Sequence, residues 1–247
     1  MTSVSGTHET PPMEMSATDA RAFWKAFVDN ATALIEDART MLSVDSFGRA
    51  RALTVLAQEE LGKALWVYET FEGAWSTGDD TSRRVDELAS HGRAHTTKYL
   101  EAVLFGEGLA RFWGDFKVLD ALHKEGESWE EAAARRRVAA EAAARAANEA
   151  KQRGFYVDRK KDGTVFSPTQ VEDGTIAEDL QKAAQVVEML LIQDHSRMKH
   201  DAITPYDSTH AQQFRLLPIS HPESWEAASD DFKKSGGDPG LGSAGSD

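Results

Sequence analysis

The chain has 247 residues, of which 40% are apolar, and its formal net charge is −13. This size suffices for the core of one domain, and the acidic balance disfavours a protein that coats nucleic acid, because phosphate neutralisation drives such binding. The absence of cysteine excludes disulfides, thiolate metal sites and cysteine nucleophiles, and fits a reducing compartment. We therefore expect a cytoplasmic protein, and the lack of an apolar stretch of about 18 residues predicts that it does not cross a membrane.

The first half of the chain predicts three long helices. Residues 1–15 are polar and lack the basic start and apolar middle of a signal peptide, so we expect a disordered leader. A first helix begins near Ser16 or Thr18, both typical N-cap residues, and ends at a short connection over residues 43–46. Apolar residues at helical spacing predict a second helix over residues 47–75 and a third over residues 82–105.

The second half predicts two more long helices and a small β-hairpin. Ser128 caps a helix rich in alanine, arginine and glutamate that ends at Gly154, and a last long helix covers residues 176–203. Between these helices, two short apolar segments that flank Lys161-Asp162-Gly163 predict the hairpin. Composition rich in glycine, serine and aspartate predicts that residues 206–247 form a largely disordered tail.

Together these elements predict an all-α fold. A glycine-punctuated aromatic stretch over residues 106–114 and a short helix that ends at His123 connect the two halves. Because no linker with a clean shift in composition divides the chain, we expect one helical domain over residues 16–205. The predicted architecture is a bundle of five to six helices with a small β-hairpin insertion.

One carboxylate in the second predicted helix falls on an apolar stripe. At about 100° per residue, Glu60 shares one face with apolar residues on both sides along the helix. A buried carboxylate is costly unless it is paired, so the position predicts a site with partners. The alternative is an ordinary surface ion pair of Glu60 or Glu59 with Lys63. Gly62 is unfavourable inside a helix, which indicates close approach of another helix or a partner chain. The apolar neighbours of Glu60 on the stripe are Leu53, Leu56, Ala57, Ala64, Val67 and Phe71.

The third predicted helix offers basic partners for this carboxylate. On a continuous helix, Arg84, His91, His95 and Lys98 fall within one sector of about 60°. One hypothesis is that His95 and Lys98 face the second helix and meet Glu60 in a partly buried site with shifted pKa values, which could transfer protons. The alternative is a solvated basic face.

The sequence contains none of the common metal or cofactor motifs. It has no Glu-x-x-His pair of the kind found in di-iron bundles, no phosphate-binding Walker loop, no nucleophile elbow and no dinucleotide fingerprint. We therefore expect neither a metal nor a cofactor.

Four segments in order resemble the AbiV family of abortive-infection proteins over roughly residues 20–205. They are Glu59-Glu60-Leu61-Gly62-Lys63-Ala64, the pair His95-x-x-Lys98, the segment from Lys151 to Asp158, and the turn at Pro168. The resemblance implies a HEPN-like helical bundle that is often dimeric. It also implies an antiphage role, with a homodimer, a phage-encoded activator protein and an RNA substrate as the partners.

Many HEPN-like proteins are metal-independent ribonucleases with an Arg-x4-6-His motif, and Arg84-x6-His91 is the nearest match in this chain. The resemblance therefore implies an endoribonuclease that shuts down translation in infected cells, with His91 or His95 moving the proton of the attacking hydroxyl. Arg84 or Lys98 then stabilises the phosphate and Glu60 orients these groups. The candidate catalytic residues are Glu60, Lys63, Arg84, His91, His95 and Lys98.

Two other hypotheses stay open. In one, the protein is not an enzyme, and binds and blocks a phage protein or a component of translation. In the other, it is a helical bundle of unrelated role. Replacement of Glu60 by glutamine discriminates between a chemical and a structural role of that carboxylate.

Overall fold

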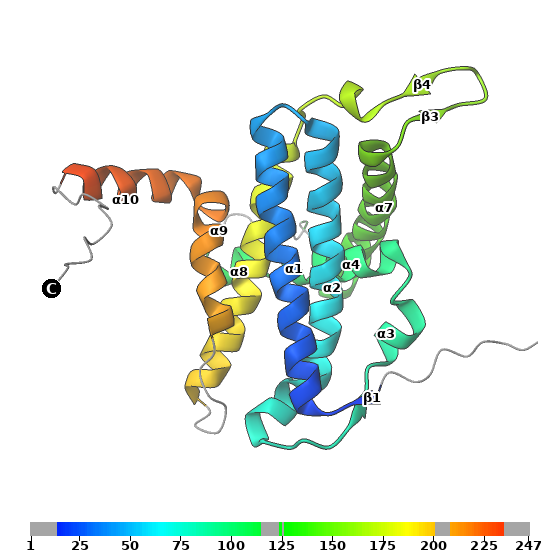
Figure 1. Ribbon diagram of the computed structural model, residues 1–247. Coiled ribbons are helices and arrows are strands. Elements are labelled where there is room, and N and C mark those ends of the chain that lie inside the picture. Colours follow the sequence, from blue (N-terminus) through cyan, green and yellow to red (C-terminus); the bar gives the residue numbers. More distant parts are fainter. Residues whose placement is uncertain (1–13, 115–123, 125, 201–207, 235–247) are drawn as a thin grey trace, which may run out of the picture.

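Two long antiparallel helices form the centre of the molecule (Figure 1). The computed structural model describes residues 14–114, 124, 126–200 and 208–234. The two helices are α1, Ala17–Ser43, and α2, Phe47–Thr77. Ser16, one of the two predicted N-cap residues, caps α1 by accepting a hydrogen bond from the Asp19 N–H. A short turn with Asp45 at φ 56° joins the helices, which therefore lie side by side along their length.

Helix α2 is covered on most of its sides. It contacts α1 along its length, and α4, α7 and α8 pack against its other faces. Its residues are accordingly buried at successive positions rather than along one stripe. The core contains Trp24, Leu61, Leu65, Phe71, Leu190 and Leu191. The three covering helices are α4, His95–Gly106, α7, Trp129–Phe155, and α8, Ile176–His200.

The helix predicted over residues 82–105 is divided in the structure, so this prediction is wrong in part. The segment forms a strand, a short helix and a longer helix, with a turn at Gly92, a poor helix former, between the two helices. These elements are β2, Arg83–Arg84, α3, Asp86–His91, and α4. Strand β1, Glu14–Met15, pairs antiparallel with β2, so the end of the predicted leader is ordered. Residues 1–13 lie outside the described residues.

The predicted all-α architecture with a small hairpin is confirmed. Helix α7 begins with a capping box, in which the side chains of Ser128 and Glu131 accept hydrogen bonds from each other's backbone N–H groups. The first apolar segment predicted for the hairpin, residues 155–157, precedes its first strand, which begins at Asp158, because α7 continues through Phe155. Gly163 turns the hairpin with φ 91°. The remaining elements of this region are α5, Leu109–Phe112, β3, Asp158–Arg159, β4, Val165–Phe166, and η1, Pro168–Gln170. The predicted short helix that ends at His123 lies almost wholly outside the described residues.

The predicted disordered tail is wrong over residues 208–234. This region forms η2, Ser208–Ala211, α9, Gln212–Ser220, and α10, Pro222–Lys234. Helix α9 packs on α8 and α1, with Leu216 fully buried, whereas α10 points away from the bundle (Figure 1). The polar composition and Pro218 concealed this helix, because only a few apolar residues anchor it.

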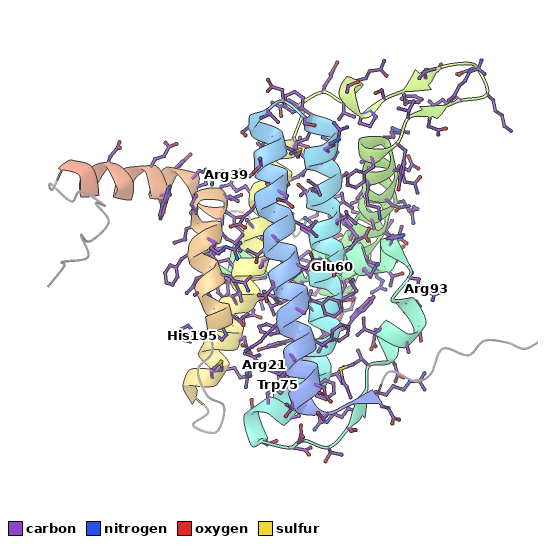
Figure 2. All side chains as sticks on the ribbon, in the orientation of Figure 1. Arg21, Arg39, Glu60, Trp75, Arg93 and His195 are labelled. Atoms are coloured by element: carbon purple, nitrogen blue, oxygen red, sulfur yellow. The ribbon has the colours of Figure 1, made fainter. Side chains whose placement is uncertain are left out.

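A buried carboxylate ties this C-terminal region to the bundle. Asp194 of α8 has no exposed side-chain surface and is bound by three basic groups. Arg21 Nη2 lies 2.6 Å and His210 Nε2 2.7 Å from its Oδ2, and Arg197 Nη2 lies 2.9 Å from its Oδ1. Figure 2 shows Arg21 and Trp75 together near the start of α1, and the Arg21 guanidinium lies 5.0 Å from the Trp75 ring. The network thus joins α1, α8 and η2.

This network predicts acid sensitivity. Burial by itself raises the pKa of Asp194, but hydrogen bonds from His210 and Arg21 and the charge of Arg197 outweigh burial, so its pKa is well below the ordinary value. A carboxyl whose pKa is lower in the folded state stabilises the fold fully above its unfolded pKa of about 4, and this contribution is lost as pH falls further. We expect the free energy of unfolding to fall more steeply from about pH 4 to pH 2 in the natural protein than in Asp194→Asn.

Urea denaturation at a series of pH values measures this slope. Asp37→Asn, which changes an exposed aspartate of α1, is the matched control and should leave the slope unchanged. Parallel curves for the natural protein and Asp194→Asn contradict the prediction.

Candidate functional site

The buried carboxylate of α2 is that of Glu59. Its side chain is 2% exposed and faces α4 and α7. Glu60, the next residue, points about 100° away around the helix. The prediction that Glu60 is the buried carboxylate is therefore wrong by one residue.

Three basic side chains surround Glu59. His95 Nδ1 lies 2.7 Å from Glu59 Oε2, and Lys98 Nζ lies 3.5 Å from the same oxygen. Lys151 Nζ of α7 donates a hydrogen bond to the other oxygen, Oε1. We call Glu59, His95, Lys98 and Lys151 the Glu59 cluster. The prediction that His95 and Lys98 face α2 is confirmed, but their partner is Glu59.

The Glu59 cluster combines buried charge with an accessible imidazole. The Lys98 and Lys151 side chains are 6% and 9% exposed, whereas that of His95 is 54% exposed. Two ammonium groups face one carboxylate, so the cluster carries a net positive charge even when His95 is neutral. Because an ionised carboxylate only accepts hydrogen bonds, a hydrogen bond at this contact requires the proton on His95 Nδ1. Nε2 is then the ring nitrogen that remains for proton transfer.

Two glycines bring α4 and α7 close to α2. A Cβ atom at Gly62 would lie 2.0 Å from the Lys98 carbonyl oxygen. A Cβ atom at Gly154 of α7 would lie 2.1 Å from the Gly48 carbonyl oxygen. The predicted close approach at Gly62 is therefore confirmed, and only glycine allows it.

Glu60 and Lys63 form a separate ion pair. Glu60 Oε1 lies 2.5 Å from Lys63 Nζ, and both side chains are 17% exposed. Lys63 Nζ also lies 4.7 Å from the centre of the Phe27 ring of α1, so this pair belongs to the contact between α1 and α2. Figure 2 shows Glu60 near the middle of α2. The predicted contact of Glu60 with His95 and Lys98 is absent from the described part of the chain.

Arg84 and His91 do not join the Glu59 cluster. Arg84 Nε lies 2.7 Å from the exposed Asp86 carboxylate, and His91 is exposed at the end of α3. Among the described residues, no hydrogen bond or ion pair links either side chain to Glu59. Their predicted alignment with His95 required one continuous helix, and the turn at Gly92 breaks it.

Sequence reasoning missed Glu59 and Lys151 as members of the site. Lys151 continues the buried face of α7 that includes Ala144 and Ala140, about two and three turns earlier. A lysine on the small-residue face of an otherwise solvated helix indicates a buried partner. The helical spacing of Lys151 with Ala140 and Ala144 could therefore have identified Lys151 as a buried residue from the sequence.

Two kinds of feature, a metal-ion cluster and a membrane-spanning helix, are absent from the described residues. Within residues 14–114, 126–200 and 208–234, no group of three acidic or histidine side chains is arranged to hold a metal ion. None of the described helices combines the length and apolar character needed to cross a membrane.

The family model HEPN_AbiV, described as AbiV, matches residues 19–188. This range contains all four members of the Glu59 cluster and ends before Asp194. No curated protein and no solved structure matches the chain significantly.

Proposed function

The chain belongs to the AbiV family of HEPN-like proteins, which indicates an abortive-infection protein, and we propose that it cleaves RNA without a metal ion. The observation that carries this proposal is the half-exposed imidazole of His95, held through Nδ1 by the buried carboxylate of Glu59. A histidine fixed in this way resembles the oriented general bases of other hydrolytic sites.

In the proposed reaction, His95 Nε2 takes the proton of a ribose 2′-hydroxyl. The 2′-oxygen attacks the adjacent phosphorus, the bond from phosphorus to the 5′-oxygen breaks, and the leaving 5′-oxygen takes up a proton. The products are a 2′,3′-cyclic phosphate and a 5′-hydroxyl. Histidine is suited to the first step because its ordinary pKa lies near neutral pH.

The charges beneath His95 support the same step. Lys98 and Lys151 place two positive charges beside one carboxylate in a region shielded from water. Buried charges act over longer range than exposed ones, so they favour the negative phosphate. We regard His95 as the catalytic residue and Glu59, Lys98 and Lys151 as positioning residues.

A homodimer would complete the site. Two copies of His95 facing one cleft would allow the second imidazole, when protonated, to supply the proton for the leaving 5′-oxygen. We propose this arrangement, with a phage-encoded protein as activator and RNA as substrate, because one imidazole does not reach both sides of an in-line displacement.

His95→Ala should lower the rate of RNA cleavage by at least about 100-fold, the usual contribution of a general base. The assay incubates purified protein with labelled RNA in the presence of EDTA, with an extract of phage-infected cells as the source of activator. His91→Ala is the matched control, since His91 is an exposed histidine without a bond to Glu59, and it should keep the full rate.

Two results would overturn the ribonuclease proposal. One is the absence of cleavage by the natural protein with the infected-cell extract. The other is equal cleavage by His95→Ala and the natural protein.

The second candidate function is a non-enzymatic interaction protein. The burial of Glu59, Lys98 and Lys151 favours this function. Their ion pairs connect α2, α4 and α7, so these charges can serve to stabilise the bundle rather than to catalyse a reaction. If His95→Ala folds and still arrests the growth of infected cells, the interaction function is supported instead.

A further inference from the structure

The β-hairpin that follows α7 exposes several large apolar side chains. Tyr156 and Val157 are 67% and 69% exposed, and Phe155 and Val165 are also exposed. The hairpin projects beyond the end of α7, at one end of the molecule (Figure 1). Single exposed apolar residues are common on protein surfaces, but four within residues 155–165 form a group of the kind that marks an interaction site.

The same segment is basic, although the whole chain has a net charge of −13. Residues 153–161 contain four basic side chains and one acidic side chain. Arg153 and Lys160 lie over the Phe166 ring of β4, 5.5 Å and 4.6 Å from its centre. This ring therefore holds two positive charges together at the hairpin.

A concavity of about 480 Å³ lies where α7 ends and the hairpin begins. Tyr156, Val157 and Arg153 line it, so apolar surface and a positive charge face the same space. Its two acidic lining residues are engaged: Glu149 Oε2 lies 3.6 Å from Arg153 Nη2, and Asp158 accepts a hydrogen bond from the next backbone N–H. We define the hairpin patch as Arg153, Tyr156, Val157, Arg159, Lys160 and Lys161.

Both ends of the hairpin are fixed on α2, the helix that carries Glu59. A Cβ atom at Gly154 would lie 2.1 Å from the Gly48 carbonyl oxygen, and one at Gly48 would lie 2.5 Å from the Pro168 carbonyl oxygen. Gly48 precedes Glu59 by eleven residues, which is about 16 Å along a helix. The hairpin patch thus has a fixed place relative to the Glu59 cluster, at a distance that a strand of several nucleotides spans.

We propose that the hairpin patch binds a single strand of RNA that extends to His95, a proposal that rests on the ribonuclease function above. Basic side chains neutralise phosphates, and the exposed Tyr156 ring can stack on a base. Base faces are covered by their neighbours in a duplex, so this stacking selects unpaired bases. A second copy of the chain fits the patch less well, because a symmetric contact would bring the basic side chains of both copies together.

Fluorescence anisotropy measures the binding of labelled RNA to the full chain. The probe is a single strand of about 12 nucleotides, within the range of known single-strand sites. Its 2′-hydroxyls are methylated, so the proposed reaction cannot cleave it. We expect the single strand to bind more tightly than the same sequence in a duplex. Tyr156→Ala should weaken binding at least about tenfold, as expected for the loss of one stacked base, whereas Tyr156→Phe keeps the ring and should retain the affinity. Phe214→Ala, which removes an exposed aromatic ring of α9, is the matched control and should not change binding.

The double substitution Lys160→Gln and Lys161→Gln tests the charges of the hairpin patch. Each phosphate contact on a single strand contributes about 0.7 to the slope of log affinity against log salt concentration, so the slope should become shallower by about 1.4. Arg39→Gln with Lys182→Gln removes two exposed positive charges outside the patch and should leave the slope unchanged.

Absence of RNA binding overturns this inference, as does tighter binding of the duplex than of the single strand. Unchanged affinity in Tyr156→Ala, or an unchanged salt slope in the double lysine variant, also overturns it. Sedimentation with phosphatidylserine vesicles, lost in the double lysine variant and seen without RNA binding, would assign the patch to a membrane surface instead. Because the probe cannot be cleaved, failure of this inference is distinct from failure of the proposed ribonuclease.

Discussion

Glu59→Gln should destabilise the protein by about 3–5 kcal/mol, as expected when one partner of a buried ion pair is removed. The substitution leaves Lys98 and Lys151 nearly buried without their counter-charge. Their ammonium groups then lose the carboxylate that offsets their desolvation. Urea denaturation followed by circular dichroism measures this change in the free energy of unfolding.

Glu60→Gln is the matched control for this prediction. It makes the same chemical change one residue further along the helix, where Glu60 pairs with Lys63 and with no other basic side chain of the described residues. Ion pairs of this i,i+3 type contribute at most about 1 kcal/mol, so we expect a small effect. Equal effects of the two substitutions would contradict the assignment of Glu59 as the organising carboxylate.

Gly62→Ala should destabilise the protein by about 3 kcal/mol, at the upper end of the usual cost of overpacking. The added Cβ atom would lie 2.0 Å from the Lys98 carbonyl oxygen, so α2 and α4 must separate. Because His95 begins α4, this separation should also disturb its hydrogen bond to Glu59. Thermal and urea unfolding measure the stability change, and RNA cleavage measures the effect on the proposed site.

Gly73→Ala tests whether the effect at Gly62 comes from the helix contact. Gly73 lies in the same helix, and a Cβ atom there would have no neighbour within 4 Å. Alanine is the better helix former, so we expect Gly73→Ala to stabilise the protein by about 0.5–1 kcal/mol. Loss of stability in Gly73→Ala, or none in Gly62→Ala, would contradict the close approach of α2 and α4.

The sequence predicted the right pair of helices but the wrong carboxylate. A hydrophobic stripe identifies the buried face of a helix that packs on one side, and the assignment of Glu60 assumed such a helix. Helix α2 is instead enclosed by several helices, so Glu59 is buried although it lies about 100° away from Glu60. A central helix has no single buried stripe.

Local signals were reliable where a single residue decides the structure. Ser16 and Ser128 cap helices as predicted, and Gly62 marks a close helix contact. Features that depend on distant partners were missed. Lys151 meets Glu59 from 92 positions away, and Asp194 meets Arg21 from 173 positions away. No local pattern specifies such pairs, because the fold alone brings them together.

The tautomer of His95 tests the central claim most directly. Nitrogen-15 NMR of the imidazole rings distinguishes a protonated Nδ1 from a protonated Nε2, and the spectrum of His95→Gln assigns the resonance. In the neutral ring, the account predicts a proton on Nδ1, bound to Glu59, and an unprotonated Nε2. A proton on Nε2 with a bare Nδ1 would contradict it, since Glu59 would then not orient His95 as a base.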